Sequence, residues 1–139
     1  MAGKTVKDVM TSSLATIDPN TTVAEAARRM AKEDVGPLPV VEGDRLVGLV
    51  TDRDLVVRVL AEGRDPQTTT VRDACSEDIV TVAPEDELDK ALAVLAGRQV
   101  RRIPVVDGNR LVGIVAQADV AREVESSTVG EIVEEISRS

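Results

Sequence analysis

The sequence contains no tryptophan, tyrosine, phenylalanine or histidine, and Cys75 is its single cysteine. Without aromatic rings the core has to be aliphatic, and no nucleic-acid base can stack on a ring of the protein. Without histidine the usual general base, the Ser-His-Asp arrangement and most transition-metal sites are excluded. A single cysteine rules out an intrachain disulfide and a cysteine-based zinc site. Cys75 is therefore interpreted as a small buried apolar residue, with a reactive thiol as the alternative.

The 139 residues carry a formal net charge of −8, from 17 basic and 25 acidic side chains. An acidic chain of this kind is poorly suited to nucleic-acid phosphates, which require clustered lysine and arginine. No apolar run approaches the roughly 20 residues of a membrane-spanning helix, and the first residues lead into no apolar stretch typical of a signal peptide. We therefore expect a soluble cytoplasmic protein with no nucleic-acid partner and no membrane span.

The chain contains an internal repeat. Residues 6–55 align with residues 71–120 without a gap, at a constant offset of 65. The identities cluster in two stretches, Pro-Val-Val at 39–41 and 104–106, and Arg-Leu-Val-Gly at 45–48 and 110–113. Such a duplication predicts two copies of one small fold. We name them copy one (1–62) and copy two (71–125); a linker (63–70) joins them, and a short amphipathic helix is expected within 126–139.

Each copy shows the same order of predicted elements, which is β-α-β-β-α after a short extended lead. In copy one these are a lead at 5–10, a strand at 14–17, a helix from Thr22-x-x-Glu25, and two strands joined by a turn at Gly43. The spacing of Thr22 and Glu25 is that of a capping box, and apolar residues then recur with helical period. A closing helix is expected to run to about Glu62. The predicted class is mixed α and β (α/β or α+β), with the copies packed around a pseudo-twofold axis because one copy alone buries little core.

The most informative stretch is the end of the third strand, where Arg45 to Asp54 reads RLVGLVTDRD. A strand that feeds directly into a helix presents free N–H groups and the positive helix end, which accommodate a phosphate. Thr51 can donate to a phosphate oxygen, and Asp54 can accept from ribose hydroxyls. The same two residues also have capping-box spacing, which needs no ligand. In copy two Asp119 is retained, but Ala116 replaces the threonine.

A second asymmetry concerns the residues before the Pro-Val-Val segment. Copy two has Arg101 and Arg102 where copy one has Gly36 and Pro37. A phosphate that approaches an acidic protein needs a local cation, and the planar guanidinium matches phosphate oxygens. The alternative is that the two arginines are a solvated pair at a strand edge.

Taken together, these features resemble a pair of CBS domains, the Bateman module. The resemblance rests on the Pro-Val-Val before each hairpin and the Gly-h-h-(Ser/Thr)-x-x-Asp after it, and it covers residues 6–120. It implies a stand-alone bacterial regulatory protein that requires no cofactor. It also implies an adenosine-containing ligand (AMP, ADP, ATP, S-adenosylmethionine or NAD) in the cleft between copies, and a disc-shaped homodimer.

The resemblance also implies roles for individual residues. In the family the matching Ser/Thr faces phosphate and the matching Asp holds ribose, so copy one has a full motif and copy two an incomplete one. We predict one principal site, in which Thr51 and Asp54 act together with Arg102 from across the pseudo-twofold axis, with Arg101 as a second candidate. The adenine lies against 16–17 and 35–39. The predicted ligand-binding residues are Thr16, Ile17, Val35, Gly36, Pro37, Pro39, Thr51, Asp54, Arg101, Arg102 and Asp119.

Three classes of function are compatible with this organisation to different degrees. The first is a ligand-sensing module, whose nucleotide changes the angle between copies or the dimer packing and is read by an unidentified protein partner. The second is an interaction or oligomerisation module without ligand, which Ala116 favours. The third, an enzyme, is disfavoured because the sequence offers no histidine, no tyrosine, no nucleophile–base pair and no metal-ligand cluster.

Overall fold

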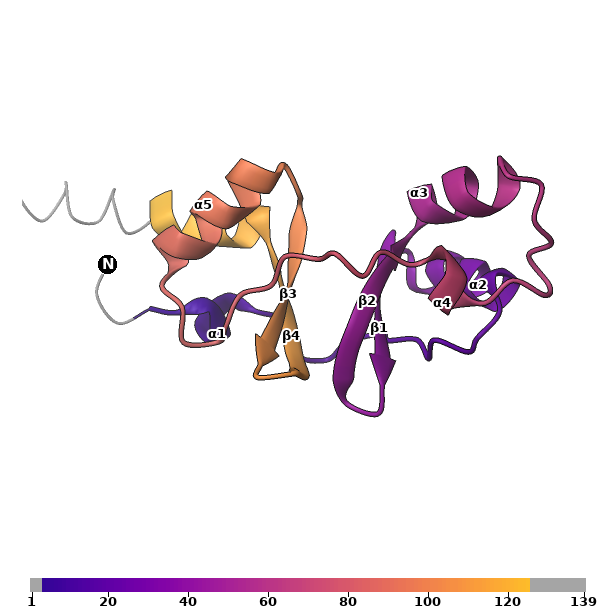
Figure 1. Ribbon diagram of the computed structural model, residues 1–139. Coiled ribbons are helices and arrows are strands. Elements are labelled where there is room, and N and C mark those ends of the chain that lie inside the picture. Colours follow the sequence, from indigo (N-terminus) through magenta and orange to yellow (C-terminus); the bar gives the residue numbers. More distant parts are fainter. Residues whose placement is uncertain (1–3, 126–139) are drawn as a thin grey trace, which may run out of the picture. The chain divides into compact units, whose positions relative to one another are not determined.

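The computed structural model describes residues 4–125, so the helix predicted within 126–139 lies outside the described residues (Figure 1). The described part is a mixture of short helices and four strands. In chain order the elements are α1 (Val6–Val9), α2 (Val23–Glu33), β1 (Pro37–Glu42), β2 (Arg45–Thr51), α3 (Asp52–Asp54), η1 (Leu55–Leu60), α4 (Val71–Ala74), α5 (Leu88–Arg98), β3 (Arg102–Asp107) and β4 (Arg110–Ala116). A further helix begins at residue 117. None of the helices described here has the length and apolarity needed to cross a lipid bilayer.

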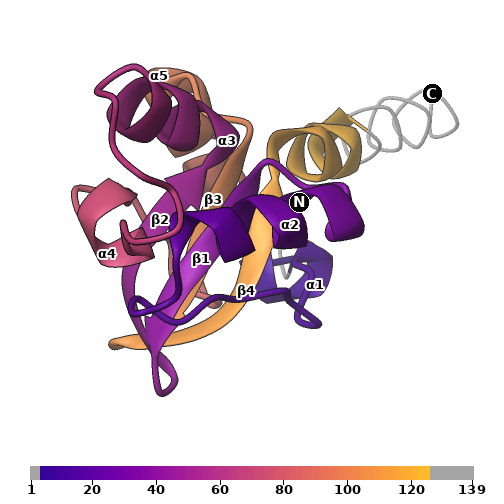
Figure 2. The ribbon, with the colours of Figure 1, turned by 90° about the vertical axis from the view of Figure 1, so that its right-hand side faces the viewer.

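The two predicted hairpins are confirmed. β1 pairs antiparallel with β2 from Pro37 opposite Thr51 to Glu42 opposite Arg45, and the two strands run side by side in both views (Figures 1 and 2). β3 and β4 are neighbours in the same way in copy two. Each tight turn contains a glycine with positive φ, 68° at Gly43 and 66° at Gly108, a conformation that glycine adopts without steric cost.

The strand predicted at 14–17, and its equivalent at 79–82, is reduced to one bridging residue in each copy. Ile17 bridges Val40 in parallel, with its N–H donating to Pro39 O at 3.0 Å and its carbonyl accepting from Val41 N at 2.9 Å. The next hydrogen bonds of a parallel ladder would need N–H groups from Pro39 on one side and Pro19 on the other, and proline has none. Copy two repeats the arrangement at Val82, so the predicted strands are wrong for a reason visible in the sequence.

The predicted extended leads are also wrong, because each contains a single helical turn. In α1 the Thr5 N–H donates to Asp8 Oδ2 at 2.8 Å, and the two residues form a capping box. Thr70 and Asp73 stand at the same spacing around α4, where the Thr70 hydroxyl donates to Asp73 Oδ2 at 3.3 Å. The local capping signal therefore outweighs the extended pattern read from the sequence.

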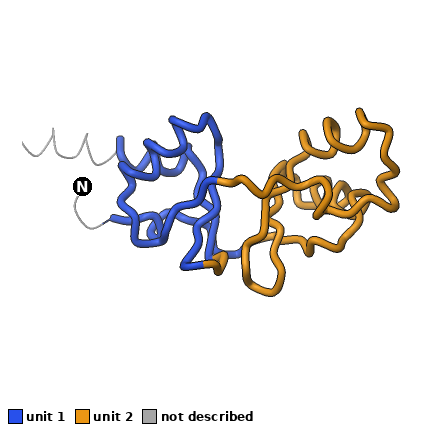
Figure 3. Tube along the Cα trace, in the orientation of Figure 1, with its two compact units in different colours: residues 1–13, 80–108, 112–139 blue, residues 14–79, 109–111 orange. Residues whose placement is uncertain are grey.

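The leads are exchanged between the copies, so that each compact unit contains pieces of both. Unit 1 comprises residues 4–13, 80–108 and 112–125 of the described part, and unit 2 comprises 14–79 and 109–111 (Figure 3). In unit 1 the Val6 N–H donates to Asp86 O at 2.9 Å; in unit 2 the Val71 N–H donates to Thr21 O at 2.8 Å. Both valines are fully buried, each in the apolar core of its unit.

Each core is aliphatic, as the composition requires. The long helix of each copy buries one face, and the Thr22 hydroxyl accepts from Glu25 N at 3.3 Å at the start of α2, as the spacing predicts. The core of unit 2 is Ile17, Val23, Ala26, Met30, Leu38, Val40, Val50, Leu55, Val59, Val71, Ala74 and Cys75. The core of unit 1 is Val6, Val82, Leu88, Ala91, Leu95, Ile103, Val105, Val115 and Val120.

The closing helix of copy one differs from the predicted α-helix. One turn, α3, passes into the π-helix η1, in which Ala61 N donates to Val56 O at 2.8 Å. The helix ends as predicted before Gly63, whose φ is 69°. Three large apolar residues of η1, Val56, Val57 and Leu60, are 54%, 47% and 63% exposed.

Candidate functional site

The strand-to-helix junction of copy one is closed by its own side chains. The Thr51 hydroxyl accepts from Asp54 N at 3.1 Å, and Asp54 Oδ2 accepts from Thr51 N at 2.9 Å. The other carboxylate oxygen of Asp54 lies 3.7 Å from Arg58 Nε, and the Asp54 side chain is only 17% exposed. The two residues predicted to hold phosphate and ribose therefore form a complete capping box that satisfies the helix N-terminus without a ligand.

Backbone groups near this junction are also occupied. The Thr16 carbonyl accepts from Arg29 Nη2 at 3.0 Å, and both backbone groups of Ile17 are used in its bridge. Gly36 O accepts from Asp52 N at 3.1 Å, and the Asp52 carboxylate lies so close that a Cβ on Gly36 would be 3.2 Å from its Oδ1. The backbone edge that was predicted to recognise adenine in copy one thus already has partners.

The junction of copy two has the same backbone and different side chains. Gln117 N donates to Arg101 O at 2.7 Å, the counterpart of the bond between Asp52 and Gly36. Ala116 has no hydroxyl, so the start of this helix lacks the side-chain cap of copy one. Asp119 Oδ1 lies 3.6 Å from Arg122 Nη1, and the Asp119 side chain is 42% exposed.

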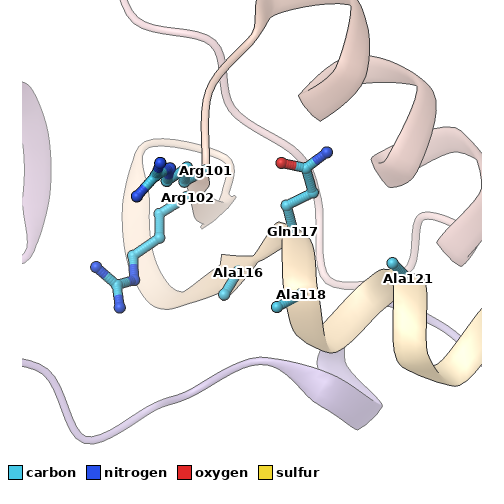
Figure 4. Close-up of a pocket in the computed structure, with 6 residues that line it drawn as sticks. All are labelled: Arg101, Arg102, Ala116, Gln117, Ala118 and Ala121. Carbon is cyan, nitrogen blue, oxygen red and sulfur yellow. The ribbon is translucent and has the colours of Figure 1, made fainter.

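A pocket of about 460 Å3 lies at this second junction (Figure 4). The arginines stand on the strand side, while three alanines and Gln117 stand at the end of β4 and the start of the following helix. Within residues 4–125 neither Arg101 nor Arg102 makes an ion pair or side-chain hydrogen bond. The complete lining is Arg101, Arg102, Ala116, Gln117, Ala118 and Ala121.

The structure divides the predicted ligand-binding residues between the two units. Unit 1 contains Arg101, Arg102 and Asp119; the other eight belong to unit 2. A single site that combines both groups stays a prediction. The sequence reasoning identified the arginines and missed Gln117, Ala118 and Ala121, whose copy-one equivalents are Asp52, Arg53 and Val56. The available signals were the loss of a negative charge at Gln117 and the small size of the two alanines.

Other reactive groups lie outside the pocket. Burial, with smaller contributions from Glu77 and Asp54, raises the pKa of the Cys75 thiol, in keeping with its interpretation as a core residue. The hydrogen bond from Ala83 N lowers the pKa of Asp86. Across residues 4–125 no group of three or more His, Cys, Asp or Glu side chains is arranged to hold a metal ion.

Comparison with known proteins identifies both copies. The family model described as CBS domain matches residues 6–61 and again residues 71–126. The CBS domain-containing protein YhcV of Bacillus subtilis is 44% identical over 133 residues, which cover 95% of this chain and 94% of that protein. Hypoxic response protein 1 of Mycobacterium tuberculosis is 37% identical over 133 residues, with coverage of 95% and 93%.

Solved structures agree with this identification. Hypoxic Response Protein I with two coordinated zinc ions matches with a TM-score of 0.80 and 38% identity over 87% of this chain and 99% of that one. CBSX2 in complex with AMP matches with a TM-score of 0.78 and 28% identity, over 91% of this chain and 99% of that one. A third match is the CBS domain pair of protein MJ0100 in complex with 5′-methylthioadenosine and S-adenosyl-L-methionine. Its TM-score is 0.75, with 26% identity over 89% of this chain and 98% of that one. The chain belongs to the CBS-domain family, as a tandem pair of CBS domains.

Proposed function

We propose that this protein is a regulatory module that binds an adenosine nucleotide of the AMP, ADP or ATP class and passes its bound state to a protein partner. The observation that carries the proposal is the pocket at the second junction, where two consecutive arginines have no carboxylate partner within the described residues. Related CBS pairs were solved with AMP and with S-adenosyl-L-methionine, which supports an adenosine-containing ligand.

The charges favour a ligand with phosphate over one without. The chain has a net charge of −8, so a phosphate is repelled at long range and needs a local pair of cations. Guanidinium groups donate two parallel hydrogen bonds to phosphate oxygens, and such charge-assisted bonds contribute roughly 1.5–3 kcal/mol each. S-adenosylmethionine carries two cationic groups and a single carboxylate, so it offers Arg101 and Arg102 less negative charge than a phosphate does, and we expect it to bind more weakly than the nucleotides.

The ribose is expected to meet a carboxylate at a strand-to-helix junction, either Asp54 or Asp119. Each follows the end of a strand by a few residues, at equivalent places in the two copies. Ribose hydroxyls are donors, and an ionised carboxylate is an acceptor for both of them. No step of this function requires chemistry on the ligand, and we propose no enzymatic activity.

A second candidate function is an interaction module, and the exposed residues of η1 favour it. Val56, Val57 and Leu60 place three apolar side chains on the surface of one helix. We propose that the protein is a homodimer that covers these residues. Leu60→Asp should then shift the mass measured by sedimentation velocity from dimer to monomer, and a wild-type monomer would remove this candidate.

Isothermal titration calorimetry tests the nucleotide proposal, since the protein has no tryptophan or tyrosine for fluorescence. AMP, ADP, ATP, S-adenosylmethionine, NADH and adenosine are titrated into the wild type and into Arg101→Ala/Arg102→Ala. The matched control, Arg98→Ala/Arg110→Ala, removes the same charge from two exposed arginines outside the pocket. We expect the pocket variant to bind ATP at least about tenfold more weakly, with adenosine unchanged.

Two results would contradict the proposal. Silence from all ligands at millimolar concentration removes the nucleotide and leaves the interaction module. Equal losses for ATP and adenosine in the pocket variant, or an equal loss of ATP binding in the control, would show that the arginines do not meet phosphate.

A further inference from the structure

We infer that the phosphate-bearing ligand is bound at the copy-two junction alone, and that copy one has diverged into a closed junction that excludes it. The inference rests on the proposed function and adds which copy binds and which side chains decide it. The gap-free repeat allows each residue to be compared with its counterpart 65 positions away. The deciding pairs are Gly36/Arg101, Pro37/Arg102, Thr51/Ala116, Asp52/Gln117 and Val56/Ala121.

Charge is the first difference between the two junctions. In copy two the residue after the strand is Gln117, which is neutral, and it lines the same pocket as Arg101 and Arg102 (Figure 4). In copy one the same backbone position is Asp52, whose carboxylate lies over Gly36. A phosphate placed there would meet the like charge of Asp52, and the strand side offers Gly36 and Pro37 where copy two has arginines. Like charges at close range destabilise each other.

The second difference is the state of the helix N-terminus. In copy one Thr51 and Asp54 satisfy each other's N–H groups at 2.9 and 3.1 Å. In copy two the Asp119 N–H has no side-chain acceptor among residues 4–125, because Ala116 carries no hydroxyl. The Asp119 side chain is also the more exposed carboxylate, at 42% against 17% for Asp54. The substitution of threonine by alanine therefore leaves this junction open to a ligand instead of disabling it.

The third difference lies on the backbone edge. The Thr16 carbonyl in copy one is taken by Arg29 at 3.0 Å. The equivalent residues in copy two are Thr81 and Val94, and valine cannot donate. In the part of the chain that the structure describes, the Thr81 carbonyl accepts no hydrogen bond. Copy two thus keeps a free acceptor where copy one has lost it.

The fourth difference is space. The pocket of copy two owes its volume to alanines at 116, 118 and 121, and its size of about 460 Å3 is within the usual range for small-ligand sites, roughly 300–1,000 Å3. The copy-one residues at those positions are Thr51, Arg53 and Val56, all of them larger. Valine at 121 would therefore fill part of the pocket.

Reciprocal exchange of residues between the copies tests the inference. Gln117→Asp and Ala121→Val give copy two the copy-one side chain, while Asp52→Gln and Val56→Ala make the matched opposite change in copy one. ATP is titrated into each variant by calorimetry. We expect one ATP per wild-type chain, a loss of at least about tenfold in affinity in Gln117→Asp and Ala121→Val, and less than about twofold change in the copy-one variants.

Folding has to be separated from binding in these variants. Far-ultraviolet circular dichroism and the urea midpoint are measured for each, and Gln117→Asp changes a partly exposed side chain without adding volume. If Ala121→Val unfolds, Gln117→Asp alone decides the matter. Two ATP molecules per wild-type chain, or a loss in Asp52→Gln or Val56→Ala that exceeds the loss in Gln117→Asp, would overturn the inference while leaving the proposed function intact. A wild type that binds no ATP would overturn both.

Discussion

Because the leads are exchanged, a mutation in the lead of copy one is expected to destabilise the unit that contains most of copy two. Val6 belongs to the lead of copy one in the sequence, but its side chain is fully buried in the core of unit 1, which contains most of copy two. Val6→Ala removes two buried methyl groups, which is worth about 1.6 kcal/mol of transfer free energy at ~0.8 kcal/mol for each group. The cavity that remains adds to this cost, so we expect about 1.5–3 kcal/mol of destabilisation in total.

Val71→Ala is the matched control, because Val71 has the same side chain, the same complete burial and the equivalent place at the start of α4. Its core is that of unit 2. Urea unfolding followed by circular dichroism gives the size of each loss. Hydrogen exchange measured by mass spectrometry on peptides gives its location. We expect Val6→Ala to accelerate exchange in α5, β3 and β4, and Val71→Ala to do so in α2, β1 and β2.

The opposite pattern would refute the exchange. If Val6→Ala loosened α2 and β1, the lead would pack on its own copy in solution. A loss well below 1 kcal/mol for Val6→Ala, with a full loss for Val71→Ala, would show that α1 is not part of the core of unit 1, since buried Val→Ala changes cost more than this.

Two other variants probe local features. Gly48→Ala places a Cβ 2.9 Å from both Cys75 Sγ and the Ser76 carbonyl oxygen, so it should lower the free energy of unfolding by about 1–3 kcal/mol. The control Gly97→Ala, whose new Cβ on α5 meets no neighbour, should raise it by about 0.5–1 kcal/mol. Equal urea midpoints for the two variants would contradict the close approach at Gly48. Asp86 has a lowered pKa because its carboxylate accepts from Ala83 N, so its stabilisation is present above the ordinary value of 3.8 and is lost as pH falls through the folded-state value. Asp86→Asn should therefore have a lower melting temperature than the wild type at neutral pH, and the difference should shrink below pH 3.8; a difference that stays the same below that pH would contradict this account.

Features set by neighbouring residues were predictable from the sequence. The hairpins follow from apolar strands on either side of Gly43 and Gly108, and the start of α2 follows from Thr22 and Glu25, because these signals act within one turn of chain. The prolines that limit the first strand to one bridge are also visible in the sequence. Whether a proline removes a ladder hydrogen bond depends on which residue of β1 pairs with Ile17, and the sequence does not give that register. The π-helix at 55–60 has no sequence signal that we can identify.

The exchange of leads could not be predicted, because the repeat makes both arrangements equally consistent with the sequence. Val6 can meet residue 21 of its own copy or residue 86 of the other, and both positions have the same surroundings in the repeat. The pocket was hidden for a different reason. A sequence motif is recognised by its functional groups, and the Thr51 hydroxyl completes the motif of copy one. The alanines that leave space in copy two carry no functional group, so they form no motif.

The prolines around the single-residue bridges have a consequence for solubility. One side of β1 pairs with β2, and on the other side the backbone ladder is limited, among residues 4–125, to the bridge at Ile17. A partly covered strand edge with exposed N–H groups is a template on which another chain can add a strand and begin to aggregate. Pro37 and Pro39 remove two of those N–H groups from β1. Pro39, which shortens the first strand, therefore also acts with Pro37 to protect an aliphatic, aromatic-free protein from edge-to-edge association.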